Sequence, residues 1–148
     1  MAPRFVRSFG WIPDLPDHRD LRLAPAPALL KALPGRVNLR RGCPPVYDQG
    51  STGSCTAQAV AAAVDYTRRQ HKMPPKFTPS RLFIYYNERV LMGDDYIHQD
   101  SGAYIRDGLK TVAREGVCPE RLWPYIETRF TEPPPIGCYT EAQRYQVL

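Results

Sequence analysis

The sequence lacks any apolar run long enough to cross a bilayer. A membrane-spanning helix needs about 18 or more consecutive apolar residues, and no segment of this 148-residue chain approaches that length. Residues 1–7 carry charges without the apolar core of a secretory signal behind them. We therefore expect a soluble, cytoplasmic protein with no membrane partner.

Cysteine and histidine are few and scattered. The four cysteines, Cys43, Cys55, Cys118 and Cys138, include no Cys-x-x-Cys pair, and the three histidines lack the spacing of a zinc finger. We therefore predict no metal site and no cofactor. In the absence of a secretory signal a disulfide framework is not required, although Cys118 and Cys138 could pair in an oxidising setting.

The sequence also lacks a concentrated patch of positive charge. The formal net charge is +5 and the pI is near 9.2, but Arg and Lys are scattered and cluster only as pairs such as Arg40-Arg41 and Arg68-Arg69. Nucleic-acid-binding proteins usually gather cations on one face or along one helix, whereas diffuse charge mainly keeps a protein soluble. No nucleic-acid partner is predicted, and a basic nucleic-acid binder is the weakest hypothesis.

Prolines divide the chain into two regions. They recur through residues 1–45, where they prevent long helices and fit poorly in central strands. We predict that residues 1–45 form an extended, propeptide-like strap with one short helical piece around Ala28–Leu33. Residues 46–148 form the second region. The whole chain has 43% hydrophobic residues, which is enough for one modest core, and we expect that core in this region.

The strap carries apolar side chains that need a surface to lie on, namely Trp11, Ile12, Leu15 and Leu21. One interpretation is a strap that packs on its own domain. The other is a segment that lies across a binding cleft, because prolines and aromatic residues suit extended peptides in grooves.

Three helices are predicted in the second region. The first spans about Ser54–His71 and is closed by Pro74-Pro75. The second follows Ser80, which can cap its N-terminus, and the third begins near Ser101-Gly102 and stops at Gly116. The predicted apolar faces are Ala57, Val60, Ala61 and Val64 in the first helix, Leu82, Phe83, Tyr86 and Val90 in the second, and Ile105, Leu109, Val112 and Ala113 in the third.

The end of the chain alternates polar and apolar residues over Tyr145–Leu148, which predicts the start of a strand. The chain would then stop inside an element, unlike a natural domain boundary.

Cys55 stands between a turn of small residues and the first of these helices. A thiolate, not a thiol, attacks carbonyl carbon, and a free cysteine is mostly protonated at neutral pH. The unpaired N–H groups and partial positive charge of a helix N-terminus favour the anion. The position therefore suits a nucleophile, although cysteine is also among the residue types most often buried for structural reasons.

The segment from Pro45 to Cys55 reads P-V-Y-D-Q-G-S-T-G-S-C and resembles the nucleophile segment Q-G-x-C-G-S-C-W of the papain-like (C1) cysteine peptidases. Later stretches follow in that family's order. Ser80–Tyr86 resembles its second helix, Asp100–Leu109 its substrate loop and third helix, and Gly116–Tyr125 its G-I/V…Y-P-Y stretch. Gly10–Asp20 resembles the lead-in of bacterial members. Together these stretches cover most of the chain.

The resemblance implies an α+β papain-like fold and a cysteine peptidase activity. Cys55 would be the nucleophile that forms a thioacyl intermediate, and the side-chain amide of Gln49 would donate to the oxyanion. Locally, Gln49 could instead be a turn residue bonded to its own loop, and Gly102 could be a helix-entry glycine. The residues that would bind a peptide or protein substrate are Gly53, Ser101, Gly102, Ala103 and Tyr104.

The chain also departs from the family pattern. Thr52 stands where many members have a cysteine that crosslinks this domain, and Thr56 replaces the usual aromatic residue after the nucleophile. The catalytic His and Asn of the family follow the cysteine by about 130 to 150 residues, whereas this chain ends at Leu148. His71 would lie about 24 Å from Cys55 along their shared helix, at about 1.5 Å per residue. The other two histidines, His18 and His98, do not match the motif.

We therefore predict that residues 46–148 form the helical left domain of a papain-like peptidase, truncated before the β-rich right domain that supplies the base. The first hypothesis is a cysteine peptidase that is inactive as this chain alone and needs a complementary C-terminal half carrying the His and Asn. The alternative is a non-catalytic binding or regulatory half-domain.

Overall fold

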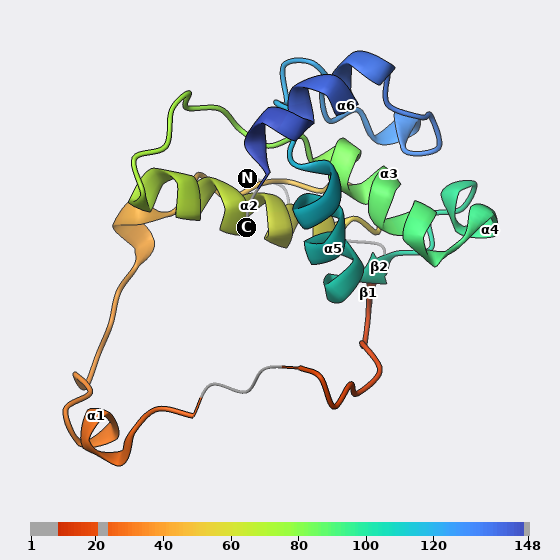
Figure 1. Ribbon diagram of the computed structural model, residues 1–148. Helices are drawn as coiled ribbons and strands as arrows, with labels where there is room; N and C mark the ends of the chain where they lie inside the picture. Colours follow the sequence, from red (N-terminus) through yellow and green to blue (C-terminus); the bar gives the residue numbers. More distant parts are fainter. Residues whose placement is uncertain (1–8, 21–23, 147–148) are drawn as a thin grey trace, which may run out of the picture.

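The computed structural model describes residues 9–20 and 24–146, and its elements are mainly helical (Figure 1). No helix within these ranges has both the length and the apolar character needed to cross a membrane. In chain order the elements are β1 Trp11–Ile12, α1 Pro27–Lys31, η1 Arg40–Gly42, α2 Cys55–Gln70, α3 Arg81–Met92, α4 Asp94–Ile97, β2 Ala103–Tyr104, α5 Ile105–Glu115, η2 Glu127–Arg129, α6 Ile136–Ala142 and η3 Gln143–Tyr145.

The main core lies where α2, α3 and α5 pack against one another. α2 has the predicted bounds within one residue at each end, and its predicted face of small apolar residues is buried. Close approach of α5 depends on Gly108, where an added Cβ would lie 3.0 Å from Val60 Cγ2. Small residues on both helices thus allow α2 to run through the middle of the fold.

α3 begins as predicted, because Ser80 Oγ accepts a hydrogen bond from the backbone N–H of Phe83 (3.1 Å). The predicted buried face is only partly correct, since Val90 is 42% exposed and Tyr86 is half-buried. The polar residues Asn87–Arg89 are buried instead. α2 and α5 cover α3 on one side, and a second apolar cluster covers it on another. The buried surface of α3 is therefore wider than the single apolar face expected from the sequence.

Arg89 is a fully buried cation that fixes the turn after α3. One guanidinium nitrogen donates to three carbonyl oxygens in the range 96–99, at 2.9 to 3.2 Å. Another donates to the carbonyl oxygen of Phe130. These bonds replace the water that burial removes, as a buried charge requires. Arg89 therefore joins the loop after α4 to the C-terminal part of the chain.

α5 begins at Ile105, later than predicted, and its buried face is rotated by about one residue. Leu109 is 56% exposed and Ala113 is exposed, so both are wrong as predicted core residues. The cause is the close packing of this helix, because the residue that faces α2 and α3 must be small. The buried residues of α5 are Gly108, Thr111 and Val112.

The second apolar cluster packs against α3 and includes residues of α6, a helix that the sequence did not predict. Its members are Leu82, Phe83, Cys118, Trp123, Cys138 and Ala142. The strand predicted over Tyr145–Leu148 is wrong at Tyr145, which is the last residue of η3. Val147 and Leu148 lie outside the described residues. The Tyr145 ring packs on Phe77 with centroids 4.7 Å apart, and its hydroxyl donates to Glu141 one helical turn earlier (3.1 Å).

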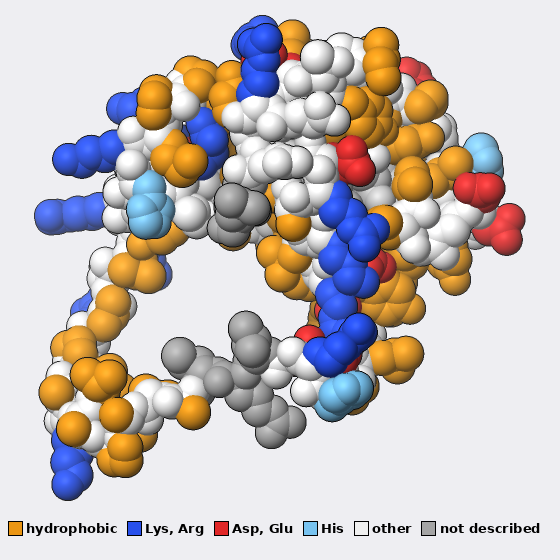
Figure 2. Space-filling model, in the orientation of Figure 1, with side chains coloured by type: hydrophobic (Ala, Val, Ile, Leu, Met, Phe, Trp, Pro, Cys, Tyr) orange, Lys and Arg blue, Asp and Glu red, His pale blue; other side chains and the backbone are white. Residues whose placement is uncertain are grey.

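The strap divides into two parts with different surroundings. Residues 24–41 are all exposed, and α1 lies apart from the helical body (Figures 1 and 2). α1 corresponds to the predicted short helical piece, but none of its residues is buried. Residues 9–20 instead approach the body, where β1 pairs in parallel with β2 through Trp11 opposite Ala103. Leu21 lies outside the described residues.

Candidate active site

Cys55 is the first residue of α2 and is half-buried. The backbone N–H groups of Gly10 and Thr56 donate hydrogen bonds to its sulfur. Burial nevertheless raises the pKa of the Cys55 thiol above its ordinary value, and the Glu88 carboxyl adds to the rise. The N–H groups at the helix start favour the thiolate as expected, but the loss of water on burial outweighs them, so the helix start alone does not activate the sulfur.

Thr56 connects the first turn of α2 to a buried acid. Its hydroxyl donates to Glu88 Oε1 at 2.6 Å, and Glu88 is fully buried. Burial raises the pKa of Glu88 to about 8. Its other oxygen, Oε2, has no hydrogen-bond partner among the described residues. At neutral pH the side chain is therefore mostly a neutral acid behind the candidate nucleophile.

Two carboxylates from distant segments hold the loop Gln49–Ser54. Glu127 accepts hydrogen bonds from both the backbone N–H and the hydroxyl of Ser51, each at 2.7 Å, and these bonds hold the pKa of Glu127 below its usual range. Asp100 accepts from the backbone N–H of Gly53 (2.9 Å). The loop before Cys55 is therefore fixed from η2 on one side and from the connection between α4 and β2 on the other.

Tyr125 ties the same loop to the second apolar cluster. Its hydroxyl donates to the carbonyl oxygen of Gln49 (2.9 Å) and shares a 2.6 Å hydrogen bond with Ser54 Oγ. Because the single phenolic proton goes to the carbonyl, the Ser54 hydroxyl donates in the second bond. The sequence pattern contained Tyr125 and Asp100 in recognisable stretches but did not indicate these roles, and it gave no signal for Glu127.

Gln49 is bonded within its own loop, which is one of the two interpretations that the sequence allowed. Its side-chain Nε2 donates to the carbonyl oxygen of Thr52 in the same loop (2.9 Å). The loop therefore orients the amide group immediately before the candidate nucleophile. Donation from Gln49 to an oxyanion stays a prediction.

Gly102 precedes β2 rather than α5, so it is not a helix-entry glycine. Its φ of 74° lies in the left-handed region that favours glycine. Its N–H donates to the hydroxyl of Tyr85 (3.2 Å), which in turn donates to Asp100 (2.5 Å). An added Cβ at Gly102 would lie 2.0 Å from the carbonyl oxygen of Gly10.

Gly10 of the strap lies between the candidate nucleophile and the candidate substrate loop. Its N–H is bonded to Cys55, and its carbonyl oxygen accepts from the N–H of Ala103 (2.7 Å). An added Cβ at Gly10 would lie 1.5 Å from the carbonyl oxygen of Gly53. Of the two interpretations of the strap, the structure therefore favours a segment that crosses the residues predicted to bind substrate.

The other predicted substrate-binding residues gather at the same edge. Ser101 Oγ donates to the carbonyl oxygen of Gly102 (2.9 Å). Ala103 is fully buried, and Tyr104 is half-buried opposite Ile12 in the strand pair. The structure thus brings this loop, Gly53 and Cys55 together around the strap. Their binding of a substrate stays a prediction.

Arg106, near the start of α5, holds the next part of the strap. Its guanidinium forms ion pairs with Asp14 (3.9 Å), Asp17 (3.3 Å) and Asp20 (2.8 Å), and it donates to the carbonyl oxygen of Leu15 (3.2 Å). The planar fork of arginine suits several acceptors at once. The sequence prediction missed this role, although three aspartates at every third position of the strap were an available signal.

The histidines are not arranged as a base for Cys55. His71 caps the opposite end of α2, His98 caps the end of α4, and the side chain of His18 is 95% exposed. No imidazole in the described ranges is hydrogen-bonded to Cys55. The same ranges contain no group of three or more His, Cys, Asp or Glu side chains able to hold a metal ion.

An apolar groove of about 660 Å³ opens beside Cys55. One wall is the outer face of α2, which presents Ala59, Ala62, Ala63 and Tyr66, and the other wall is the segment 39–47. This face of α2 continues the line of small residues away from the nucleophile.

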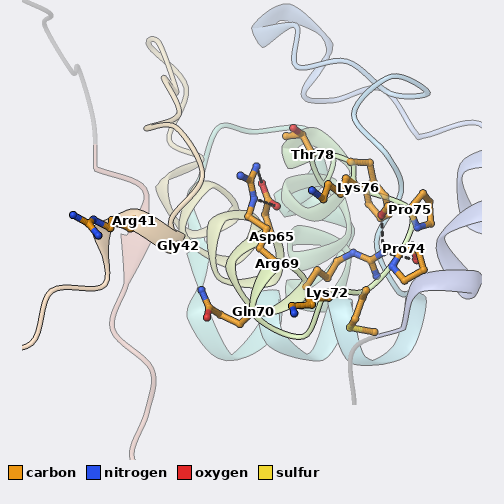
Figure 3. Close-up of a pocket in the computed structure, with 13 residues that line it drawn as sticks. Arg41, Gly42, Asp65, Arg69, Gln70, Lys72, Pro74, Pro75, Lys76 and Thr78 are labelled. Carbon is orange, nitrogen blue, oxygen red and sulfur yellow. Dashed lines mark hydrogen bonds and ion pairs between the residues drawn. The ribbon is translucent and has the colours of Figure 1, made fainter.

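A second pocket, of about 870 Å³, lies at the far end of α2 (Figure 3). Lys72, Lys76 and the Asp65–Arg69 ion pair are among its lining residues. None of the predicted site residues lines it, so it is separate from the site around Cys55.

Comparison with known proteins gave one curated relative and two solved structures of note. The chain is 40% identical over 153 residues to the uncharacterized peptidase C1-like protein L477 of Acanthamoeba polyphaga mimivirus, a match over 93% of this chain and 49% of that protein. It is 43% identical to xylellain, a cysteine protease from Xylella fastidiosa, with a TM-score of 0.86 over 99% of this chain and 59% of that one. No protein-family model matches the chain.

A more distant match is a chain from structural work on the mite allergens Blo t 1 and Der p 1. It is 24% identical, with a TM-score of 0.53 over 64% of this chain and 31% of that one, and it bears on the fold alone. The chain spans about half the length of the curated relative it matches. Sequence and structure together show that the chain belongs to the papain-like C1 family and corresponds to the helical half of that fold.

Proposed function

We propose that this chain is the nucleophile-bearing half of a papain-like cysteine peptidase. Cys55 would attack the carbonyl carbon of a peptide, and the resulting thioacyl group would then be hydrolysed by water. The observation that carries the proposal is the position of Cys55 at the start of α2, between the Gln49–Ser54 loop and Gly102. The 43% identity to xylellain, a cysteine protease, supports it.

In this proposal Gln49 and the backbone N–H of Cys55 donate to the oxyanion that forms during attack. Each such donor contributes about 3 to 4 kcal/mol, because it is aimed at charge that appears only in the transition state. The bond from Gln49 to Thr52 and the bond from Tyr125 to the Gln49 carbonyl fix the position of this loop before substrate arrives. Preorganisation of this kind is what an oxyanion site requires.

The proposed activity needs a complementary half that carries the base. The exposed face of α2 beside Cys55 is a suitable docking surface, since Ala59, Ala62 and Ala63 allow close backbone approach and Tyr66 adds apolar area. The relatives extend well beyond the matched region, which leaves ample length for such a half. Without it, Cys55 keeps a raised pKa and has no described histidine to remove its proton. We therefore expect this chain to be inactive alone.

The strap would have to leave before an extended substrate could pair with Gly102. Gly10 occupies the space against Gly102 and Gly53, and its N–H is bonded to the candidate nucleophile. We therefore assign residues 9–20 an inhibitory role in the assembled peptidase. Displacement of this segment would return water to Cys55, which favours the thiolate, and would also remove the Gly10 N–H, which lowers the pKa of the thiol.

The test is peptidase activity and labelling by a thiol-directed epoxide in the full-length gene product. Wild type should cleave peptides and take up one epoxide at Cys55, and Cys55→Ala should lose both. Cys43→Ala is the matched control, because Cys43 is free and exposed and lies in the wall of the groove opposite α2. Retained proteolysis in Cys55→Ala would refute the proposal.

The second candidate is a non-catalytic binding half-domain. It is favoured by the raised pKa of Cys55 and by the strap that covers it. The intact mass of the native gene product distinguishes the binding half-domain from the peptidase. A stable species of 16.9 kDa without a copurifying partner supports the binding module, whereas a longer chain or a copurified half supports the peptidase.

A further inference from the structure

Two of the four cysteines lie side by side in the second apolar cluster. Cys118 and Cys138 are both free, and their exposed fractions are 0% and 2%. The Cys118 thiol donates to the carbonyl oxygen of Pro119 (3.5 Å) and the Cys138 thiol to that of Leu122 (3.8 Å), so both sulfurs meet the same turn. Cys118 belongs to the segment after α5 and Cys138 to α6, so the contact joins two parts of the chain that are separated by a long irregular stretch.

We propose that Cys118 and Cys138 form a redox-controlled disulfide clamp between α6 and the segment after α5. The oxidant is a low-molecular-weight disulfide such as oxidised glutathione. The thiolate of Cys138 attacks one sulfur of the oxidant and expels a glutathione thiolate, which gives a mixed disulfide. The thiolate of Cys118 then attacks Cys138 sulfur and expels the second glutathione. The two cysteine protons end on the two released thiols, so the protein loses two hydrogens and one oxidant is reduced.

Burial makes this clamp conditional. It raises the pKa of the Cys118 thiol well above its usual range, and the neighbouring Cys138 adds to the rise. Thiolate is therefore scarce while α6 is docked, and exchange must wait for α6 to open. α6 is short and holds to the body mainly by Cys138, Tyr139 and Ala142, with the Tyr139 ring 5.0 Å from Phe83. Local opening of such a helix is far easier than global unfolding.

The clamp would act on the loop before Cys55. The segment that the disulfide closes carries Tyr125 and Glu127, which bind the backbone and side chains of the Gln49–Ser54 loop. Closing the segment reduces the freedom of the unfolded chain and limits the opening of α6. The disulfide therefore stabilises the support of the loop without touching it.

The experiment incubates the reduced chain with buffers of increasing oxidised-to-reduced glutathione ratio, alkylates free thiols and maps the cysteines by mass spectrometry after tryptic digestion. The expected product is a disulfide between peptides 115–121 and 130–144, with Cys43 as internal control for exposed thiols, which take up glutathione. The oxidised chain should melt about 10 °C above the reduced chain, as expected for a loop of this length. Sub-denaturing urea should speed formation, because it favours opening of α6.

Free or glutathionylated Cys118 and Cys138 at the most oxidising ratio, with sub-denaturing urea present, would overturn the proposal. So would a disulfide from either residue to Cys43. Cys138→Ala should abolish the rise in melting temperature while Cys43→Ala retains it. If Cys138→Ala fails to fold, the comparison of oxidised with reduced wild type still decides. None of these readouts uses peptidase activity.

Discussion

The helical body and the strap are held in place by different forces. The body buries apolar side chains around α2, α3 and α5, and it surrounds the buried cation Arg89 with backbone carbonyl oxygens. The strap buries little, and residues 9–20 are held by a two-residue strand pair and by ion pairs to Arg106. Residues 24–41 have a higher apolar content but are all exposed. Apolar content alone therefore does not dock a segment.

The two regions also differ in their response to pH. Burial raises the pKa of Glu88 in the body, whereas bonds from Arg19, with a smaller effect of Arg106, hold the pKa of Asp17 in the strap well below its usual range. A lowered folded-state pKa stabilises above the unfolded-state pKa, and the effect is lost as pH falls through the folded value. A rise in pH from 4.5 to about 8 thus weakens the body through Glu88, whereas this contact of the strap is weakened only by acid.

The largest expected effect on the strap comes from Gly10→Ala. The new Cβ would lie 1.5 Å from the carbonyl oxygen of Gly53, a distance that no side-chain adjustment relieves, so β1 should detach. The rate of Cys55 alkylation by a small thiol reagent should rise by about tenfold or more, because both coverage and the burial that raises its pKa are lost. Gly35→Ala is the matched control, since nothing lies within 4 Å of its added Cβ. Equal rates for the two variants would contradict the role of Gly10.

The next effect concerns the body and is a pH dependence. Because the folded-state pKa of Glu88 is raised, the folded protein holds this proton more tightly than the unfolded chain, so stability falls as pH rises from 4.5 to about 8. Glu88→Gln should remove this slope and unfold at higher urea than wild type at about pH 9. The control is Glu132→Gln, whose parent side chain is 50% exposed. If the stability of Glu88→Gln still falls with pH as steeply as that of wild type, a group other than Glu88 titrates.

A smaller effect is expected from Arg106→Ala. Exposed ion pairs contribute roughly 0.2 to 1 kcal/mol each, and three of them converge on this side chain. The population of undocked strap should rise by about three- to tenfold, which limited proteolysis between residues 13 and 25 measures. Arg114→Ala tests the effect of charge loss alone, because its parent residue is on the same helix but in the exposed last turn. High salt should reduce the difference between Arg106→Ala and wild type.

The smallest effect is expected in the exposed part of the strap. Leu30 in α1 is 53% exposed, and no residue of this helix is buried. Leu30→Ser should change the free energy of unfolding by no more than about 0.5 kcal/mol. Leu82→Ser, at a position 1% exposed, is the contrasting variant and should destabilise strongly. A large loss of stability in Leu30→Ser would show that α1 packs on something.

The features that the sequence predicted correctly are those set by local chemistry. The start and end of α2 and the cap at Ser80 follow from residues within a few positions of each other. Cys55 was placed correctly at a helix start for the same reason. These features need no knowledge of the partner surface.

The features that the sequence missed depend on contacts between distant segments. The buried face of α5 is set by the need for Gly108 to meet α2, which apolar periodicity within one helix does not reveal. Arg89 is buried because carbonyl oxygens from two other segments converge on it. The raised pKa of Cys55 likewise comes from burial in the folded chain, which a position at the start of a helix does not reveal.

The direction in which Gly10 meets Cys55 has a consequence for the durability of the strap. The N–H of Gly10 points toward the sulfur, and in a trans peptide the carbonyl of the same group, that of Phe9, points the opposite way. The following carbonyl, of Gly10 itself, is bonded to Ala103. The Gly10 carbonyl is thus already engaged in the contact with β2, and we expect a peptidase built on Cys55 to leave the segment that covers it uncut. Such a cover can open and close repeatedly, whereas a cleavable one acts once.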